Sequence, residues 1–156
     1  MKKARLNCIC LLFITIFISL ASCHINHYVN GEGNKRVSYP SNMWKCLVAE
    51  SASEGYRGMK TVALVYRNRL ERGMRLGCSG LKRRNLNAFI KKEGRRKEIL
   101  AKRVVKEVFE ENCADFTNGA THYENLESFP TPPWAKDMII IRKEGKHTLY
   151  NYKRNE

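Results

Sequence analysis

The sequence predicts an α+β domain that is mainly helical and ends in a small C-terminal β-hairpin. Apolar residues recur at helical spacing in several segments between residues 41 and 112. Near the C-terminus, two runs rich in strand-forming residues, 137–142 and 147–152, flank a polar turn at 143–146. The chain has 156 residues, of which 43% are hydrophobic. It can therefore build one core and is not a mainly disordered protein.

The N-terminal segment predicts export. A basic start, residues 1–5, precedes an apolar run at 8–21 that is short for a membrane span and typical of a secretory signal. Residues 20–23 resemble the bacterial lipobox, in which the chain is cut before the cysteine and the Cys23 thiol is lipidated. An ordinary signal peptide cut nearby and an uncleaved anchor are the alternatives. The domain is exported under all three interpretations.

These features divide the chain into three parts. We expect a lipoprotein-type signal peptide at residues 1–22, a polar tether at 23–40 and the folded domain at 41–156. The expected location is that of an exported lipoprotein, anchored in a membrane and facing the periplasm or the cell wall. We expect the domain to be a monomer.

The net charge of +14 draws the chain to polyanions. Nucleic acid and the acidic polymers of a bacterial wall are the two candidates, and export favours the wall. The most basic segment, 82–97, contains one aromatic residue, Phe89, whereas nucleic-acid binding needs aromatics interleaved with basic residues. We therefore expect no nucleic-acid partner.

The cysteines allow at most one disulfide within the exported domain. Besides Cys23, that domain keeps Cys46, Cys78 and Cys113. Buried free thiols and one disulfide both remain open. No Cys or His spacing is typical of zinc, so we expect neither a metal nor a cofactor.

The first expected helix begins near Ser41, a residue suited to an N-cap, and carries Met43, Leu47 and Val48 on one side. Residues 51–54 have the Ser-x-x-Glu form of a capping box, which predicts a second helix over roughly 53–71.

The rest of the chain alternates between clear and unclear patterns. Gly73 is suited to end the second helix, and a third helix is expected over about 96–112. The segment 73–98 has few apolar residues and no clear periodicity. Regular structure is excluded around the prolines Pro130, Pro132 and Pro133.

Glu50 is the most informative carboxylate. It falls at the edge of the apolar stripe of the first helix, and therefore at the lip of a core. A carboxylic acid half in apolar surroundings can hold its proton near neutral pH and act as a general acid, as glycoside cleavage requires. The alternative is an ordinary surface residue at a helix end. Glu54, one turn on, is either the second member of a carboxylate pair or the capping residue of the next helix.

A second cluster of polar and aromatic residues follows the expected turn at 118–119. Thr121, His122 and Tyr123 are of the kind that bind sugars by stacking and hydrogen bonding, although a histidine in a loop is more often structural. Trp134, which follows two prolines, is either a cleft wall or a core anchor.

Taken in order, these segments resemble the cell-wall hydrolases of the SleB/CwlJ type over roughly residues 43–152. The most specific match is Gly-Ala-Thr-His-Tyr at 119–123. The second is Glu-x-x-x-Glu-Gly at 50–55, followed by a helix that ends in Asn-Arg at 68–69. Two further segments complete the pattern, Pro-Trp-Ala at 133–135 and Gly-Lys-His-Thr-Leu-Tyr at 145–150.

The resemblance implies a lysozyme-like fold and cleavage of peptidoglycan between N-acetylmuramic acid and N-acetylglucosamine. Its catalytic glutamate matches Glu50. In lytic transglycosylases, which the family resembles, one Glu serves as acid and then as base while the 6-hydroxyl of muramic acid attacks. The product is a 1,6-anhydro sugar, and no second carboxylate is needed. The implied partners are peptidoglycan and, through the N-terminal lipid anchor, a membrane.

The candidate substrate-binding residues are Glu54, Asn68, Thr121, His122, Tyr123 and Trp134. In the middle of the chain the family usually has a Gln-Phe-Ser-like segment, and the nearest stretch here is 87–89. A non-catalytic peptidoglycan-binding lipoprotein with the same fold is the alternative. Retention of Glu50 argues against it, because binding alone needs no acid at the edge of a core.

Overall fold

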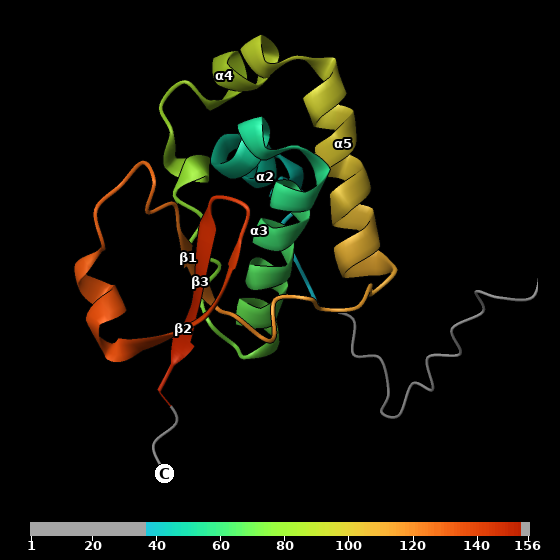
Figure 1. Ribbon diagram of the computed structural model, residues 1–156. Coiled ribbons are helices and arrows are strands. Elements are labelled where there is room, and N and C mark those ends of the chain that lie inside the picture. Colours follow the sequence, from blue (N-terminus) through green and yellow to red (C-terminus); the bar gives the residue numbers. More distant parts are fainter. Residues whose placement is uncertain (1–36, 154–156) are drawn as a thin grey trace, which may run out of the picture. The chain divides into compact units, whose positions relative to one another are not determined.

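The computed structural model describes residues 37–153 (Figure 1). The expected signal peptide, the lipidation site Cys23 and most of the tether lie outside the described residues. Within 37–153, no helix combines the length and the apolar content needed to cross a membrane. Tyr39, which we assigned to the tether, packs on the domain, because its ring lies 4.8 Å from that of Phe109 and its hydroxyl donates to Glu110 at 2.7 Å.

The domain is a mixture of helix and sheet and is about 52% helical. Three helices form the body, as predicted: α2 (Met43–Ser51), α3 (Gly55–Glu71) and α5 (Arg95–Val105). A wider π-helical turn, η3 (Lys106–Glu110), continues α5 to the end expected for the third helix. The helices pack against one another through fully buried side chains. The largest of these are Met43, Leu47, Met59, Val62, Leu64, Val104 and Val108.

Both predicted N-caps are wrong. Residue Asn42, not Ser41, occupies the N-cap position of α2, and it makes no side-chain capping bond. Ser51 is the last residue of α2, and its hydroxyl donates to the carbonyl of Leu47 at 2.9 Å, which leaves it unavailable as a cap. The tight turn η1 (Ala52–Glu54) then separates the two helices, and Glu54 makes no side-chain capping bond to α3.

The segment without clear periodicity contains two short helices, η2 (Gly80–Lys82) and α4 (Leu86–Glu93). In α4 the only buried residue is Ile90, so the apolar signal of this helix is weak. A disulfide joins Cys46 of α2 to Cys78 just before η2, which settles the pairing that the sequence left open. Cys113 is a free, partly buried thiol.

The sheet has three antiparallel strands in the order β1-β3-β2. The predicted hairpin is confirmed by β2 (Met138–Glu144) and β3 (His147–Tyr152). The short strand β1 (His122–Glu124), which was not predicted, pairs with β3 and sets Tyr123 opposite Leu149. Figure 1 shows the sheet beside α3, and Val65 of α3 packs with Leu149 in a small core between them.

Candidate active site

A cleft of about 660 Å³ opens where the end of α2, the second half of α3, β1 and the segment 129–134 meet. The last two residues of that segment begin the short 3-10 helix η4 (Pro133–Asp137), so the expected exclusion of regular structure is wrong at Pro133, which is tolerated in a first helical turn. Five of the site residues predicted from the sequence line this cleft: Glu50, Thr121, His122, Tyr123 and Trp134. Glu54 and Asn68 are not among its lining residues. Other lining residues were not anticipated, and the most informative are Tyr66, Arg69, Ser79, Glu124 and Phe129.

Glu50 is held at both carboxylate oxygens. The backbone N–H of Gly80 donates to Oε1 at 2.5 Å, and the Ser79 hydroxyl donates to the same oxygen at 2.7 Å. The Tyr123 hydroxyl donates to Oε2 at 3.1 Å. The carboxylate is therefore oriented by donors from two segments distant in sequence, the loop before η2 and the strand β1.

The disulfide explains why that loop reaches Glu50. Cys46 lies four residues before Glu50 on α2, so both side chains leave the same face of the helix. The bond to Cys78 draws the following residues, Ser79 and Gly80, over the carboxylate. The Cys78 sulfur lies 3.7 Å from Oε1 of Glu50 and, as a disulfide sulfur, has no proton to donate.

Gly80 allows this close approach because it has no side chain. A Cβ at this position would lie 2.5 Å from the Cβ of Ala49 and 3.0 Å from Oε1 of Glu50. We therefore expect Gly80→Ala to displace the loop and to slow any reaction of Glu50 by about a hundredfold, as a misplacement of about 1 Å can do.

The matched control for Gly80→Ala is Gly94→Ala. Gly94 has a φ of +88° and nothing within 4 Å of its would-be Cβ, so alanine strains the backbone there without touching the cleft. Thermal unfolding measures stability in both variants, and only the first is expected to lose activity on the substrate of the cleft. Equal activity in both variants would show that the Gly80 loop does not position Glu50.

Tyr123 links Glu50 to a second buried phenol. The Tyr66 and Tyr123 hydroxyls lie 2.9 Å apart, and because Tyr123 donates to Glu50, Tyr66 donates to Tyr123. Burial raises the pKa of both tyrosines, and the negative charge of Glu50 raises each pKa further. Both are neutral donors at physiological pH. The sequence places Tyr66 within the apolar stripe of the second helix, which does not reveal this role.

Aromatic rings form one side of the cleft. The His122 ring lies 5.3 Å from that of Trp134, and Trp134 lies 5.3 Å from Tyr150. Trp134 is 39% exposed and Phe129 is 59% exposed, so both present apolar surface to a ligand. Flat sugar faces stack on surfaces of this kind.

His122 is a neutral member of this group. Burial and the nearby Arg69 guanidinium lower its pKa to about 4. Its Nδ1 lies 3.0 Å from the hydroxyl of Thr121, and Arg69 donates to the Thr121 carbonyl at 3.0 Å. Thr121 is fully buried, so its role is to fix the start of β1, while His122 is the member of the pair that presents a ring to Trp134.

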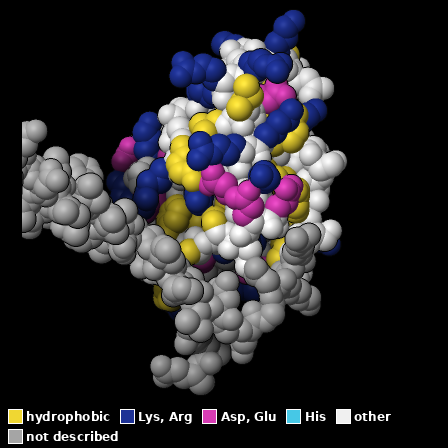
Figure 2. Space-filling model, turned by 90° about the vertical axis from the view of Figure 1, so that its right-hand side faces the viewer, with side chains coloured by type: hydrophobic (Ala, Val, Ile, Leu, Met, Phe, Trp, Pro, Cys, Tyr) yellow, Lys and Arg dark blue, Asp and Glu magenta, His cyan; other side chains and the backbone are white. Residues whose placement is uncertain are grey.

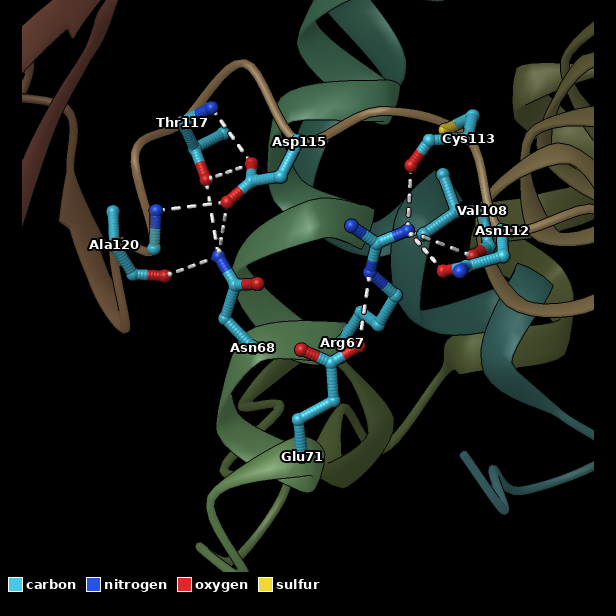
Figure 3. A network of polar contacts seen from close by, with 10 residues as sticks. Arg67, Asn68, Glu71, Val108, Asn112, Cys113, Asp115, Thr117 and Ala120 are labelled. Carbon is cyan, nitrogen blue, oxygen red and sulfur yellow. Dashed lines mark hydrogen bonds and ion pairs between the residues drawn. The ribbon is translucent and has the colours of Figure 1, made fainter. Parts of the chain in front are cut away.

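Asn68 does not line the cleft but holds the turn that leads into β1. Its amide nitrogen donates to Asp115, Thr117 and the carbonyl of Ala120, each at 3.1 Å (Figure 3). Asp115 also accepts from the backbone N–H groups of Thr117 and Gly119. Burial favours a higher pKa for Asp115, but these hydrogen bonds outweigh it and lower that pKa. The amide thus fixes the turn that leads into β1.

Arg67 anchors the other end of the same segment to α3. Its guanidinium donates to the carbonyls of Val108 and Cys113 and to the side chain of Asn112 (Figure 3). The adjacent residues Arg67 and Asn68 therefore bind the two ends of the connection between η3 and β1.

We expect Asn68→Ala to lower the free energy of unfolding by about 2–3 kcal/mol, because it leaves the buried carbonyl of Ala120 without its donor and removes one donor from the partly buried Asp115 carboxylate. Chemical denaturation measures this loss. The control is Asn87→Ala, which removes one exposed hydrogen bond to Lys45 and is expected to change stability by less than about 0.5 kcal/mol. A loss at Asn68 no larger than that at Asn87 would contradict the anchoring role.

Glu54 faces the interior beside the hairpin. Its Oε2 lies 3.2 Å from Nε2 of His147, and the two side chains are 9% and 2% exposed. Burial lowers the pKa of His147, although Glu54 and other nearby carboxylates oppose this shift. The structure thus gives Glu54 a buried partner in β3, whereas Glu124 on β1 is the second carboxylate that lines the cleft.

Within residues 37–153, no group of three or more His, Cys, Asp or Glu side chains is arranged to hold a metal ion. Comparison of the chain with protein-family models, curated protein sequences and solved structures finds no match. The cleft itself offers an oriented carboxylate, two neutral phenols and an aromatic wall.

Proposed function

We propose that the protein cleaves the glycan strands of peptidoglycan with Glu50 as general acid and base, in a lysozyme-like domain related to the SleB/CwlJ-type hydrolases. The observation that carries this proposal is the orientation of Glu50 at both oxygens inside a cleft that also presents aromatic surface. A positioned carboxylic acid is what proton transfer to a glycosidic oxygen requires, and aromatic surface suits the faces of sugar rings.

The hydrogen bonds suggest how the proton moves. Oε1 already accepts from the Gly80 N–H and the Ser79 hydroxyl, so the proton of the acid form resides on Oε2. Glu50 gives this proton to the glycosidic oxygen as the bond to the muramic acid carbon breaks. The carboxylate then takes the proton of the 6-hydroxyl while that oxygen attacks the same carbon. A 1,6-anhydro sugar forms, and Glu50 is again protonated.

The neighbouring residues support these two steps. Tyr123 donates a hydrogen bond to Oε2 whenever Glu50 is ionised, and Tyr66 donates one to Tyr123. His122 and Trp134 offer ring surface to the sugars, whereas Thr121 and Asn68 hold β1, the strand that carries His122. We propose that Glu54 has a structural role and does not contact the substrate, because its partner is His147.

Direct hydrolysis is the second candidate, and one observation favours it. Glu124 lines the cleft with Glu50, so a second carboxylate is present that is able to activate a water molecule. That product carries a reducing muramic acid end. Replacement of Glu124 separates the two routes, because only hydrolysis needs its carboxylate.

We also propose that the domain is exported and tethered by a lipid on Cys23. The Cys46–Cys78 disulfide is compatible with an oxidising compartment outside the cytoplasm.

The test of the proposed function is the release of soluble glycan fragments from purified, protein-free peptidoglycan sacculi. Release by the wild-type protein supports cleavage. Binding of the protein to sacculi without any release would instead support the alternative, a peptidoglycan-binding lipoprotein that does not cut.

A further inference from the structure

A strongly basic surface covers α4 and its two flanks. Its members are Lys82, Arg83, Arg84, Lys91, Lys92, Arg95 and Arg96, all exposed. In the described part of the chain, none of them forms a salt bridge, whereas their neighbour Lys97 pairs with Glu93 at 3.1 Å. Figure 2 shows Lys and Arg side chains in dark blue gathered at the top of the molecule, where Figure 1 places α4 and the start of α5.

This basic surface is hollowed as well as charged. A depression of about 350 Å³ is lined by Arg83, Arg84, Asn85, Phe89 and Lys92, together with a small alanine. Cationic groups from different positions around one hollow suit an anionic group such as a phosphate. Arginine in particular matches phosphate oxygens with its fork of N–H donors.

The one aromatic residue in the segment 82–97, Phe89, already stacks with an arginine of the same surface. The guanidinium of Arg83 lies over the Phe89 ring, 4.0 Å from its centre. Single-stranded nucleic acids are bound by stacking on exposed aromatic faces in addition to charge. The basic surface therefore offers charge to phosphates, while its single aromatic ring is already in contact with an arginine.

The basic surface and the cleft are connected through the short helix η2. Gly80, whose N–H binds Glu50, lies two residues before Lys82, and both belong to η2. A polymer attached to a glycan strand in the cleft is thus within reach of α4.

We propose that the basic surface binds a phosphodiester polymer without bases, of the polyol phosphate kind that is attached to bacterial walls. The choice of a wall polymer rests on the proposed function, whereas the binding itself does not depend on cleavage. Binding releases counterions and therefore weakens with salt, with each phosphate contact adding to the slope. The surface would hold the enzyme on wall regions that carry such polymers.

The test is calorimetric titration of the full chain with poly(glycerol phosphate) at low and physiological salt. The triple variant Arg83→Gln, Arg84→Gln, Lys92→Gln is compared with a control triple of the same charge change. The control replaces Lys136, Lys146 and Lys153 by Gln, since these lysines are exposed and form no salt bridge in the described residues. We expect the first triple to lose about tenfold in affinity and to show a flatter salt dependence, and the control to lose less than about twofold.

Equal losses in the two triples would overturn the proposal, because net charge alone would then explain binding. Oligo(dT) with the same number of phosphates is expected to bind no more than about threefold tighter than the polymer. Tighter binding than this would assign the surface to nucleic acid. Poly-L-glutamate of equal charge is expected to bind more weakly, and equal or tighter binding would overturn the assignment to phosphate.

Glu50→Gln separates this proposal from the proposed function. We expect this variant to bind poly(glycerol phosphate) with the wild-type affinity although it does not cut peptidoglycan. Conversely, a wild-type protein that cuts peptidoglycan but does not bind the polymer would overturn the binding proposal alone.

Discussion

Replacing Glu50 by Gln is expected to lower the rate of glycan cleavage by about a thousandfold, which is the contribution typical of a general acid and base. The amide has the shape of the carboxylate and still accepts from Gly80 and Ser79 through its oxygen. It has no acidic proton to give to the glycosidic oxygen. Because the shape of the side chain is unchanged, we expect the fold to be kept. The loss of rate then reflects the missing proton. Initial rates of fragment release from peptidoglycan measure it.

The controls for Glu50→Gln are the two other carboxylates of the region. Glu54→Gln alters a buried contact with His147 and is expected to cost stability more than rate. Glu124→Gln is expected to change the rate by less than about tenfold, because anhydro-sugar formation needs a single Glu. A Glu50→Gln variant that retains more than a tenth of the wild-type rate would refute its role as acid and base.

Removing the Cys46–Cys78 disulfide is expected to produce the largest loss of stability. The bridge spans 32 residues, and a loop of that length gives about 3–4 kcal/mol in the chain-entropy model. The double variant Cys46→Ser, Cys78→Ser should therefore show a midpoint of denaturation well below that of the wild type.

The same variant is expected to lose activity beyond its loss of stability. Ser79 and Gly80, the donors to Oε1 of Glu50, follow directly after Cys78. When the bridge is absent this loop is free to leave the carboxylate, so the rate should fall even at temperatures where the domain is folded. Cys113→Ser is the control, because its thiol is free and only partly buried. A folded, fully active protein without the bridge would contradict this positioning role.

The helical body and the hairpin could be predicted because their signals are local. The apolar residues of α3 include the helical spacing Met59, Val62, Ala63 and Tyr66, all buried, and β2 and β3 are adjacent in sequence. The strand β1 was not predictable in this way. It is three residues long and exists through its pairing with β3, which is distant in sequence. The expected capping box failed because Ser51 bonds to its own helix.

The candidate site shows the same division. Glu50 was identifiable because a carboxylate at the edge of an apolar stripe must lie at the lip of the core. Thr121, His122 and Tyr123 follow a turn whose residues Asn118 and Gly119 both have positive φ angles, as their types suggested. Ser79 and Gly80 gave no signal, because tertiary contacts, the disulfide among them, bring their loop to Glu50. The sequence does not show which cysteine is the partner of Cys46 or of Cys78.

The central claim is that Glu50 cleaves glycan strands by passing one proton to the leaving oxygen and taking one from the 6-hydroxyl. The most direct test is mass spectrometry of the products that the wild-type protein and Glu50→Gln release from purified peptidoglycan. The account predicts fragments with 1,6-anhydromuramic acid ends, lighter by one water than hydrolytic products, from the wild type and none from the variant. Reducing muramic acid ends from the wild type, peptidoglycan left intact by the wild type, or anhydro fragments released by the variant would contradict it.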